Sequence, residues 1–171
     1  MLLSDAVHRR ELAKRKGVQP YSGNGKALER RDRVKVSFTI DGDPVGKGRP
    51  RVTKTGRAYT PKATQKYEAI VKTLYKTECK YTFPEGVPLD VRITSYHYIP
   101  SSASRKLKEA MRTHKARPCK KPDVDNIVKI ILDSLNRIAY HDDAQVVDLQ
   151  VRKFYSDKPR VVVTIQEAKT Y

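Results

Sequence analysis

The sequence predicts a single small α+β domain, in which helices pack on a mixed or antiparallel sheet. Three observations lead to this prediction. The chain has 171 residues, which is enough for one ordinary hydrophobic core. Segments with alternating apolar residues, typical of half-buried strands, are interspersed with segments whose apolar residues recur at helical spacing. They follow the order strand, helix, strand, basic helix, helix, strand, strand, with no internal repeat.

The first ordered elements are predicted to be a strand and a helix. Residues 1–33 mix short polar runs with glycine and proline, so we expect a basic, flexible extension before a folded domain of residues 34–171. Alternation over Val34–Ile40 predicts a strand. A helix is expected after Thr60, as its cap, with Pro61 in its first turn. Its predicted buried face is Ala63, Tyr67, Ile70, Val71 and Leu74.

Three further strands are expected later in the chain. Alternation over residues 89–94 predicts a strand that leads to Tyr96 and Tyr98. We expect these tyrosines to pack within the sheet, and the alternative is that they pack on a base. Residues 147–151 and 161–165 repeat the alternation on either side of a turn. This pair predicts a closing β-hairpin.

The chain carries a large positive charge. Lys and Arg total 36 against 19 Asp and Glu, a formal net charge of +17. Such a surplus predicts a polyanionic partner, and nucleic acid is the first candidate. Cys79 and Cys119 lie far apart without metal-ligand spacing, which argues against a disulfide framework and a zinc site. The first apolar run is too short for a signal peptide or membrane span, so we expect a cytoplasmic protein.

Two segments concentrate the positive charge. Residues 44–62 contain no acidic residue, and their glycines and prolines predict a loop that contacts DNA phosphates through backbone N–H and guanidinium groups. The alternative is an ordinary solvated loop. Residues 101–121 contain eight Lys or Arg and one Glu, which predicts a basic helix and loop that attracts a phosphate backbone. The candidate DNA-binding residues are Lys47, Arg49, Arg51, Lys54, Arg57, Lys62, Arg105, Lys106, Arg117, Lys120 and Lys121.

Acidic residues are concentrated in residues 121–147, which read KPDVDNIVKIILDSLNRIAYHDDAQVV. Pro122 predicts an extended start, after which Asp125 or Asn126 can cap a helix. Apolar residues then recur at helical spacing, with polar residues on the opposite face. The apolar stripe is Ile127, Ile130, Ile131, Leu135 and Ile138, and the wet face is Asn126, Lys129, Asp133 and Arg137.

Two acidic pairs flank this helix. Asp123 and Asp125 are two residues apart in an extended stretch, so both carboxylates can point to the same side. Asp142 and Asp143 lie in a turn after the helix, and a strand antiparallel to the helix would return them towards one end of the first pair. Convergent carboxylates beside Lys129 indicate a Mg²⁺ or Mn²⁺ site, which supports phosphodiester hydrolysis. The alternative is that the first pair are helix caps and the second pair are turn residues.

These residues resemble a known family. KPDVDNIVKIILDSLN followed by YHDDAQVVDL is similar to the signature of the RusA endodeoxyribonucleases, the small dimeric, Mg²⁺-dependent resolvases of Holliday junctions in phages and bacteria. The resemblance extends from about Val34 to Glu167. It implies that Asp123, Asp125 and Asp143 are catalytic metal ligands and that Lys129 is the catalytic lysine. Asp142 also matches a family position and is included among the candidate metal ligands.

The resemblance therefore predicts a Mg²⁺-dependent endonuclease, with Mn²⁺ as the alternative metal, that resolves Holliday junctions by paired nicks in DNA recombination and repair. A homodimer is expected because a C2 dimer presents two equivalent active sites to a four-way junction of near two-fold symmetry. We expect a bacterial or phage-encoded protein that binds branched DNA, without a membrane or a small-molecule cofactor beyond the metal. Two alternatives stay open: a non-catalytic basic DNA-binding protein that retains the nuclease fold, and a nuclease that prefers other branched DNA.

Overall fold

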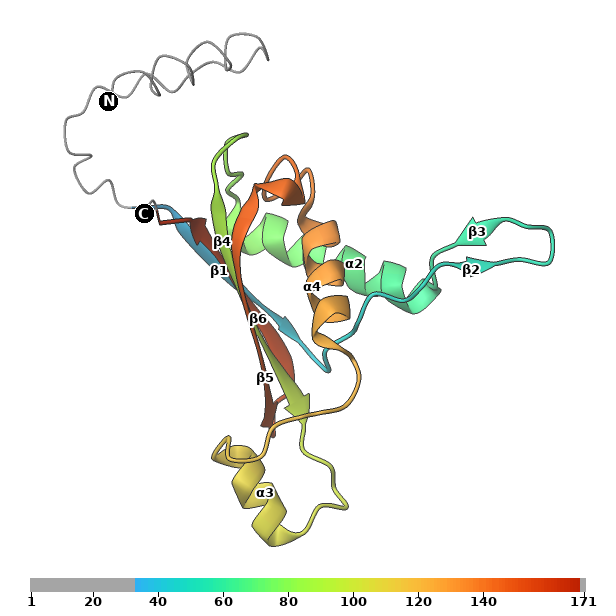
Figure 1. The fold of residues 1–171 in the computed structure, drawn as a ribbon, viewed down its shortest axis with the longest axis vertical. Coiled ribbons are helices and arrows are strands. Elements are labelled where there is room, and N and C mark those ends of the chain that lie inside the picture. The colour runs from blue at the N-terminus through green and yellow to red at the C-terminus, as the bar shows by residue number, and fades with distance from the viewer. Residues whose placement is uncertain (1–32, 170–171) are drawn as a thin grey trace, which may run out of the picture. The chain divides into compact units, whose positions relative to one another are not determined.

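A computed structural model describes residues 33–169 of the chain (Figure 1). The predicted extension of residues 1–33 therefore lies almost wholly outside the described residues. Four strands form one sheet in the order β1-β6-β4-β5, and two short strands form a separate β2-β3 hairpin. The elements are β1 (Lys35–Asp41), β2 (Arg51–Val52), β3 (Ala58–Tyr59), α2 (Lys62–Leu74), the π-helical turn η1 (Tyr75–Cys79), β4 (Leu89–Tyr98), α3 (Arg105–Arg112), α4 (Val124–Leu135), the 3-10 turn η2 (Asp143–Gln145), β5 (Val146–Ser156) and β6 (Arg160–Glu167).

The sheet is mixed, and β6 lies between β1 and β4. β6 pairs antiparallel with both of these strands, whereas β4 and β5 are parallel. The predicted closing hairpin of residues 147–151 and 161–165 is therefore wrong. Val161, Val163 and Ile165 of β6 are buried completely or almost completely, so this strand gains most by lying at the centre of the sheet. The less buried β5 takes the edge.

Helices α2 and α4 cover one face of the sheet, and the predicted α+β class is confirmed (Figure 1). The apolar stripe predicted for α4 is buried from Ile127 to Leu135, while Ile138 lies beyond the helix end and packs against the core. The opposite face of the sheet carries polar side chains such as Thr94, Arg152 and Gln166. The core therefore lies in a single layer between the sheet and the two helices.

α2 departs from its prediction at two points. No side chain caps the helix, so the proposed cap at Thr60 is wrong. Thr64 is buried because its Oγ1 accepts a hydrogen bond of 3.2 Å from the N–H of Gly48, which turns this polar residue towards the preceding loop. The buried face is correct for Tyr67, Val71 and Leu74 and wrong for Ala63 and Ile70, which are exposed.

The two basic segments leave the body of the domain. Residues 51–59, for which we expect a loop, form the β2-β3 hairpin that projects away from the helices (Figure 1). The basic helix expected in residues 101–121 is confirmed as α3, and the Ser104 hydroxyl caps it by accepting a hydrogen bond from the N–H of Leu107. Met111 anchors α3 in a small second core beyond the end of β4. Within residues 33–169 no helix has the length and apolar character needed to cross a membrane.

Candidate active site and nucleic-acid interface

The start of α4 carries two exposed carboxylates that do not cap the helix, although Oδ1 of Asp125 accepts a hydrogen bond of 3.4 Å from Nδ2 of Asn126. Asp123 occupies the N-cap position with extended backbone angles of φ −73° and ψ 156°, but its side chain makes no capping hydrogen bond. Asp125 lies in the first helical turn, so the expected cap at Asp125 or Asn126 is wrong. Both aspartates are exposed. Their carboxylates are therefore available to a ligand rather than used by the helix.

A glycine-containing loop is clamped against this helix start. The N–H of Lys47 donates a hydrogen bond of 2.8 Å to the carbonyl of Asn126. Gly46 packs so tightly that a Cβ there would lie 2.9 Å from Cβ of Pro122 and 3.0 Å from Cβ of Asn126. Only glycine permits this approach, which brings the loop that leads to Arg49 against the start of α4.

The clamped loop and the start of α4 enclose an open pocket. Its lining combines Asp123 with three cationic side chains, those of Lys47, Arg49 and Lys121. Arg49 and Lys121 are exposed, whereas Lys47 is partly buried. A carboxylate beside exposed cations is suited to hold a divalent cation together with an anionic ligand, because the metal and the cations share the ligand's negative charge.

Lys47 is occupied by two carboxylates. Its Nζ lies 2.5 Å from Glu68 of α2 and 2.8 Å from Asp133 of α4. Burial alone would lower the pKa of Lys47, but the hydrogen bonds to Asp133 and Glu68 outweigh it and raise the pKa above the ordinary value. Lys47 therefore joins the two helices. Sequence reasoning missed Glu68, although it is the one acidic residue of α2 and could have been noticed for that reason.

Lys153 of β5 holds the segment that leads into Asp123. Its Nζ donates hydrogen bonds to the carbonyls of Lys120, at 2.7 Å, and Pro122, at 2.8 Å. Arg117 adds a hydrogen bond of 3.0 Å from Nε to the carbonyl of Lys153, and its guanidinium lies 4.6 Å from the ring centre of Phe154. We did not predict this role. Lys153 falls between Val151 and Tyr155 on the same face of an alternating strand. A lysine on such an inward face is the signal that could have predicted its structural role.

The second acidic pair lies at the other end of α4. Lys153 of β5 lies beside the start of α4, whereas η2, just before β5, follows the end of α4, so β5 runs antiparallel to the helix. The convergence of the two acidic pairs that the sequence predicts does not occur within one chain. The 12 residues of α4 separate the two acidic pairs by about 18 Å at 1.5 Å per residue. Within residues 33–169 no three acidic, histidine or cysteine side chains gather closely enough to hold a metal ion.

Asp142 and Asp143 differ in their surroundings. Asp142 caps η2, because its Oδ1 accepts a hydrogen bond of 2.9 Å from the N–H of Ala144 and the Gln145 side chain completes a capping box. Asp143 is partly buried beside Tyr140. Burial, with the charges of Asp143 and Asp133 nearby, raises the pKa of Tyr140 above its ordinary range. Asp142 thus fits the alternative of a turn residue, and Asp143 is the better candidate ligand of the pair.

Lys129 lies exposed on α4, between Asp125 and Asp133 in sequence. Among the described ion pairs of residues 33–169 none involves Lys129, and Asp133 is paired with Lys47 instead. The simple alternative, that Lys129 serves only to pair with a neighbouring aspartate, therefore has no support in the geometry. Its ammonium group is available to a ligand beside Asp125.

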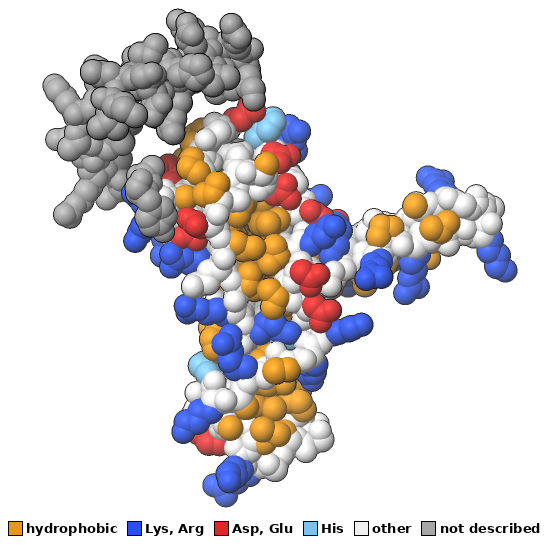
Figure 2. All heavy atoms as spheres, in the orientation of Figure 1, with side chains coloured by type: hydrophobic (Ala, Val, Ile, Leu, Met, Phe, Trp, Pro, Cys, Tyr) orange, Lys and Arg blue, Asp and Glu red, His pale blue; other side chains and the backbone are white. Residues whose placement is uncertain are grey.

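An apolar strip separates the two acidic ends. Val124 of α4 is 44% exposed, and Val147 and Leu149 of β5 are 61% and 46% exposed. Val124 and Leu149 line an open groove between α4 and β5 together with Val128. Figure 2 shows hydrophobic side chains running along this face, with acidic side chains beside its upper and lower parts. Exposed apolar area of this kind indicates a surface that is covered by a partner.

The remaining candidate DNA-binding residues lie on the surface. They comprise Arg51, Lys54 and Arg57 on the hairpin, Lys62 at the start of α2, Arg105 and Lys106 on α3, and Arg117, Lys120 and Lys121 before α4, all of them exposed. Arg49 and Lys121 are the exposed cations that line the pocket with Asp123, and Figure 2 shows further Lys and Arg side chains spread over this face of the molecule. Lys47 differs from the rest because two carboxylates already neutralise it.

These features define a class of protein: a small, basic α+β domain with a free carboxylate pair among exposed cations. Comparison with known proteins identifies the family. The family model described as "Endodeoxyribonuclease RusA" matches residues 41–166. The chain is 41% identical over 140 residues to the uncharacterised protein YqaN of Bacillus subtilis (strain 168), covering 77% of this chain and 96% of that protein. It is 29% identical over 139 residues to the crossover junction endodeoxyribonuclease rusA of Lactococcus phage r1t, covering 79% and 98%. The chain belongs to the RusA endodeoxyribonuclease family.

Proposed function

We propose that this protein is a Mg²⁺-dependent endonuclease, active also with Mn²⁺, that resolves four-way DNA junctions by paired nicks. The observation that supports the proposal is the pair of exposed carboxylates at the start of α4, of which Asp123 lines the pocket with Arg49 and Lys121, and Asp125 lines the groove between α4 and β5. Family membership and the net charge of +17 support a DNA substrate. The name of the phage relative supports a junction as the form of that DNA.

Each residue has a separate task in this proposal. Asp123 and Asp125 supply carboxylate oxygens, the donors that Mg²⁺ prefers, and the bound ion supplies charge neutralisation and an activated water. Arg49 and Lys121 hold the phosphate backbone next to the carboxylates. Lys129 offsets negative charge that develops on the scissile phosphate, because a protonated lysine does not ligate Mg²⁺. Asp143 supplies a third carboxylate.

The third carboxylate requires a second copy of the chain. Asp143 lies about one helix length from Asp123, so the two residues of one chain cannot share an ion. A two-fold axis through the apolar strip would set the α4 helices of two copies antiparallel. The end of α4 that carries Asp143 in one copy then meets the end that carries Asp123 and Asp125 in the other. The exposed Val147 and Leu149 are buried by the same contact.

A cleavage assay tests the function. The protein is incubated with a labelled mobile four-way junction, with a flap and with linear duplex, with and without Mg²⁺. The proposal expects paired symmetric nicks in the junction, little cleavage of duplex, and no cleavage without a divalent metal. Equal cleavage of flap and junction would support the broader branched-DNA nuclease. Binding of the junction without cleavage in Mg²⁺ or Mn²⁺ would support the non-catalytic alternative.

Mixed dimers test the shared site. Asp125→Asn and Asp143→Asn are each expected to abolish cleavage while junction binding is retained, since an amide is a poor ligand for Mg²⁺. If each site takes Asp125 from one copy and Asp143 from the other, a mixed dimer has one intact site and one doubly substituted site. Refolding the two variants together should therefore restore single nicks. If each site is built within one chain, both halves of the mixed dimer stay inactive.

A further inference from the structure

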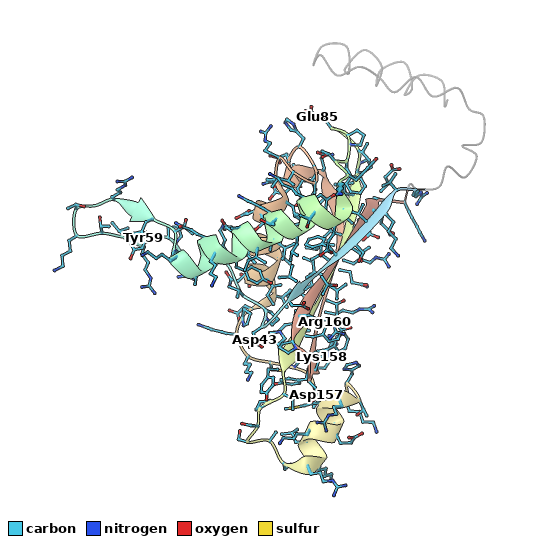
Figure 3. All side chains as sticks on the ribbon, turned by 180° about the vertical axis from the view of Figure 1, so that it is seen from behind. Asp43, Tyr59, Glu85, Asp157, Lys158 and Arg160 are labelled. Atoms are coloured by element: carbon cyan, nitrogen blue, oxygen red, sulfur yellow. The ribbon has the colours of Figure 1, made fainter. Side chains whose placement is uncertain are left out.

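The β2-β3 hairpin carries exposed apolar side chains on a basic arm. All residues from Arg49 to Tyr59 are exposed, and Val52 and Tyr59 are 66% and 45% exposed. The hairpin projects away from the sheet and helices, with Tyr59 on its second strand (Figure 3). A two-stranded hairpin of this length is only marginally stable in water by itself. Val52 and Tyr59 are therefore accessible to any ligand that the basic arm binds.

The tip of the hairpin is held in one conformation by its own hydrogen bonds. The N–H of Thr53 donates to the carbonyl of Arg57 at 2.9 Å, and the N–H of Arg57 donates to Oγ1 of Thr53 at 3.1 Å. Gly56, with φ of +80°, supplies the left-handed turn. These hydrogen bonds favour one turn conformation at the tip, which lowers part of the entropic cost of binding.

Pairing divides the hairpin into two different faces. Arg51 lies opposite Tyr59 and Val52 lies opposite Ala58, so each pair shares one face. One face combines an aromatic ring with a guanidinium, and the other is wholly apolar. Phosphate contact alone needs neither Tyr59 nor Val52. An aromatic ring beside a guanidinium matches a nucleobase with its phosphate, because every base offers a flat surface for stacking.

The charge of the segment favours nucleic acid as the partner. No acidic residue occurs between Asp43 and Glu68, and seven Lys or Arg lie in this interval. Arg49 at the base of the hairpin lines the pocket that contains Asp123, so DNA bound at the pocket passes beside the hairpin. In an intact duplex every base is stacked within the helix. Bases next to a branch point are the ones that can leave the stack at low cost.

We propose that the β2-β3 hairpin recognises the branch point of the DNA, with Tyr59 stacking on an unstacked base and Lys54 and Arg57 contacting phosphates at the tip. This inference rests on the proposed function and deepens it, because it assigns the preference for branched DNA to a specific element. The carboxylates then act on a phosphate at a set distance from the branch point. The hairpin gives selectivity, and the pocket gives cleavage.

The test uses junctions with 2-aminopurine beside the branch point, whose fluorescence rises when the base leaves the stack. Binding is measured without divalent metal, so that no cleavage occurs. The parent protein should raise the fluorescence. Tyr59→Ala should abolish the rise and weaken junction binding by about fivefold or more, the effect of losing one stacked base, with duplex binding within about twofold of the parent. Tyr59→Phe should behave as the parent, since it keeps the ring.

Tyr98→Ala is the matched control, because Tyr98 is 52% exposed on β4 and lies outside the hairpin. It should leave both the fluorescence rise and the affinity unchanged. An unchanged rise with Tyr59→Ala, or an equal loss with Tyr98→Ala, would overturn the inference, while junction cleavage by the parent in Mg²⁺ would still support the nuclease. A parent protein that neither binds nor cleaves junctions would overturn both proposals.

Discussion

Replacing Lys47 tests whether this residue contacts DNA or holds the domain together. Lys47→Met keeps most of the apolar stem and removes the ammonium group that joins Glu68 to Asp133. Exposed ion pairs contribute at most about 1 kcal/mol, whereas removing one partner of a buried pair costs about 3 to 5 kcal/mol. The side chains of Lys47, Glu68 and Asp133 are 23%, 19% and 31% exposed, which lies between these limits. We therefore expect the free energy of unfolding to fall by about 1 to 3 kcal/mol.

Urea denaturation measures this loss, and its pH dependence gives a second check. The pKa of Lys47 is raised in the folded protein, so its stabilising effect is complete below the ordinary value of 10.5 and is lost as pH rises through the folded-state pKa. The difference between parent and Lys47→Met should thus be constant near neutral pH and should narrow above about pH 10.5. A difference that stays constant above that pH would show that the ammonium group of Lys47 is not the source of the lost stability.

Arg49→Gln is the matched control in the same loop. Arg49 is exposed, so the substitution should change the free energy of unfolding by less than about 0.5 kcal/mol. The slope of log affinity against log salt should become shallower by about 0.9, the contribution of one phosphate contact. Lys47→Met should leave that slope unchanged. If Lys47→Met reduced the slope and left stability intact, Lys47 would be a phosphate ligand and the account of the ion pairs would be wrong.

Three further substitutions separate catalysis, assembly and folding. Lys129→Ala should slow single-turnover cleavage strongly and leave junction binding near normal. A rate within about threefold of the parent corresponds to less than about 1 kcal/mol of activation free energy and would remove Lys129 from the catalytic residues. Leu149→Asp places a charge in the apolar strip, so the protein should sediment as a monomer and lose cleavage activity. A dimer that persists in this variant would show that the interface lies elsewhere. Asp142→Ala should lower the free energy of unfolding by about 0.5 to 2 kcal/mol through loss of the cap on η2, and an unchanged urea midpoint would argue against that role.

Local patterns in the sequence were sufficient for the elements of the main sheet and for its helices. The alternation over Val34–Ile40 and the helical spacing from Ile127 to Leu135 each correspond to an element in the structure, because the side-chain period of a strand or helix is a local property. The acidic start of α4 was found in the same way. The prediction of helix caps was less accurate, since the N-cap of α4 is Asp123 and the predicted cap was Asp125 or Asn126.

Strand order could not be read from the same patterns. Val161 and Val147 both lie in alternating segments, yet one is buried in the central β6 and the other is exposed on the edge strand β5. The choice depends on which strand gains more by contact with neighbours on both sides, a property of the assembled core. The β2-β3 hairpin was missed because its two-residue strands are too short to show a period.

The sequence by itself determined the candidate site residues, and tertiary structure decided which of them meet. Residue types and spacing predict two acidic pairs, the family resemblance implies Asp123, Asp125 and Asp143 as the ligands, and both leave open which end of the helix the second pair approaches. The length of α4 and the antiparallel course of β5 place Asp143 at the far end. Lys47 looks like any other cation of its loop until α2 and α4 bring two carboxylates to its ammonium group. Contacts between distant segments depend on how the elements pack, and packing is settled only when the whole core has formed.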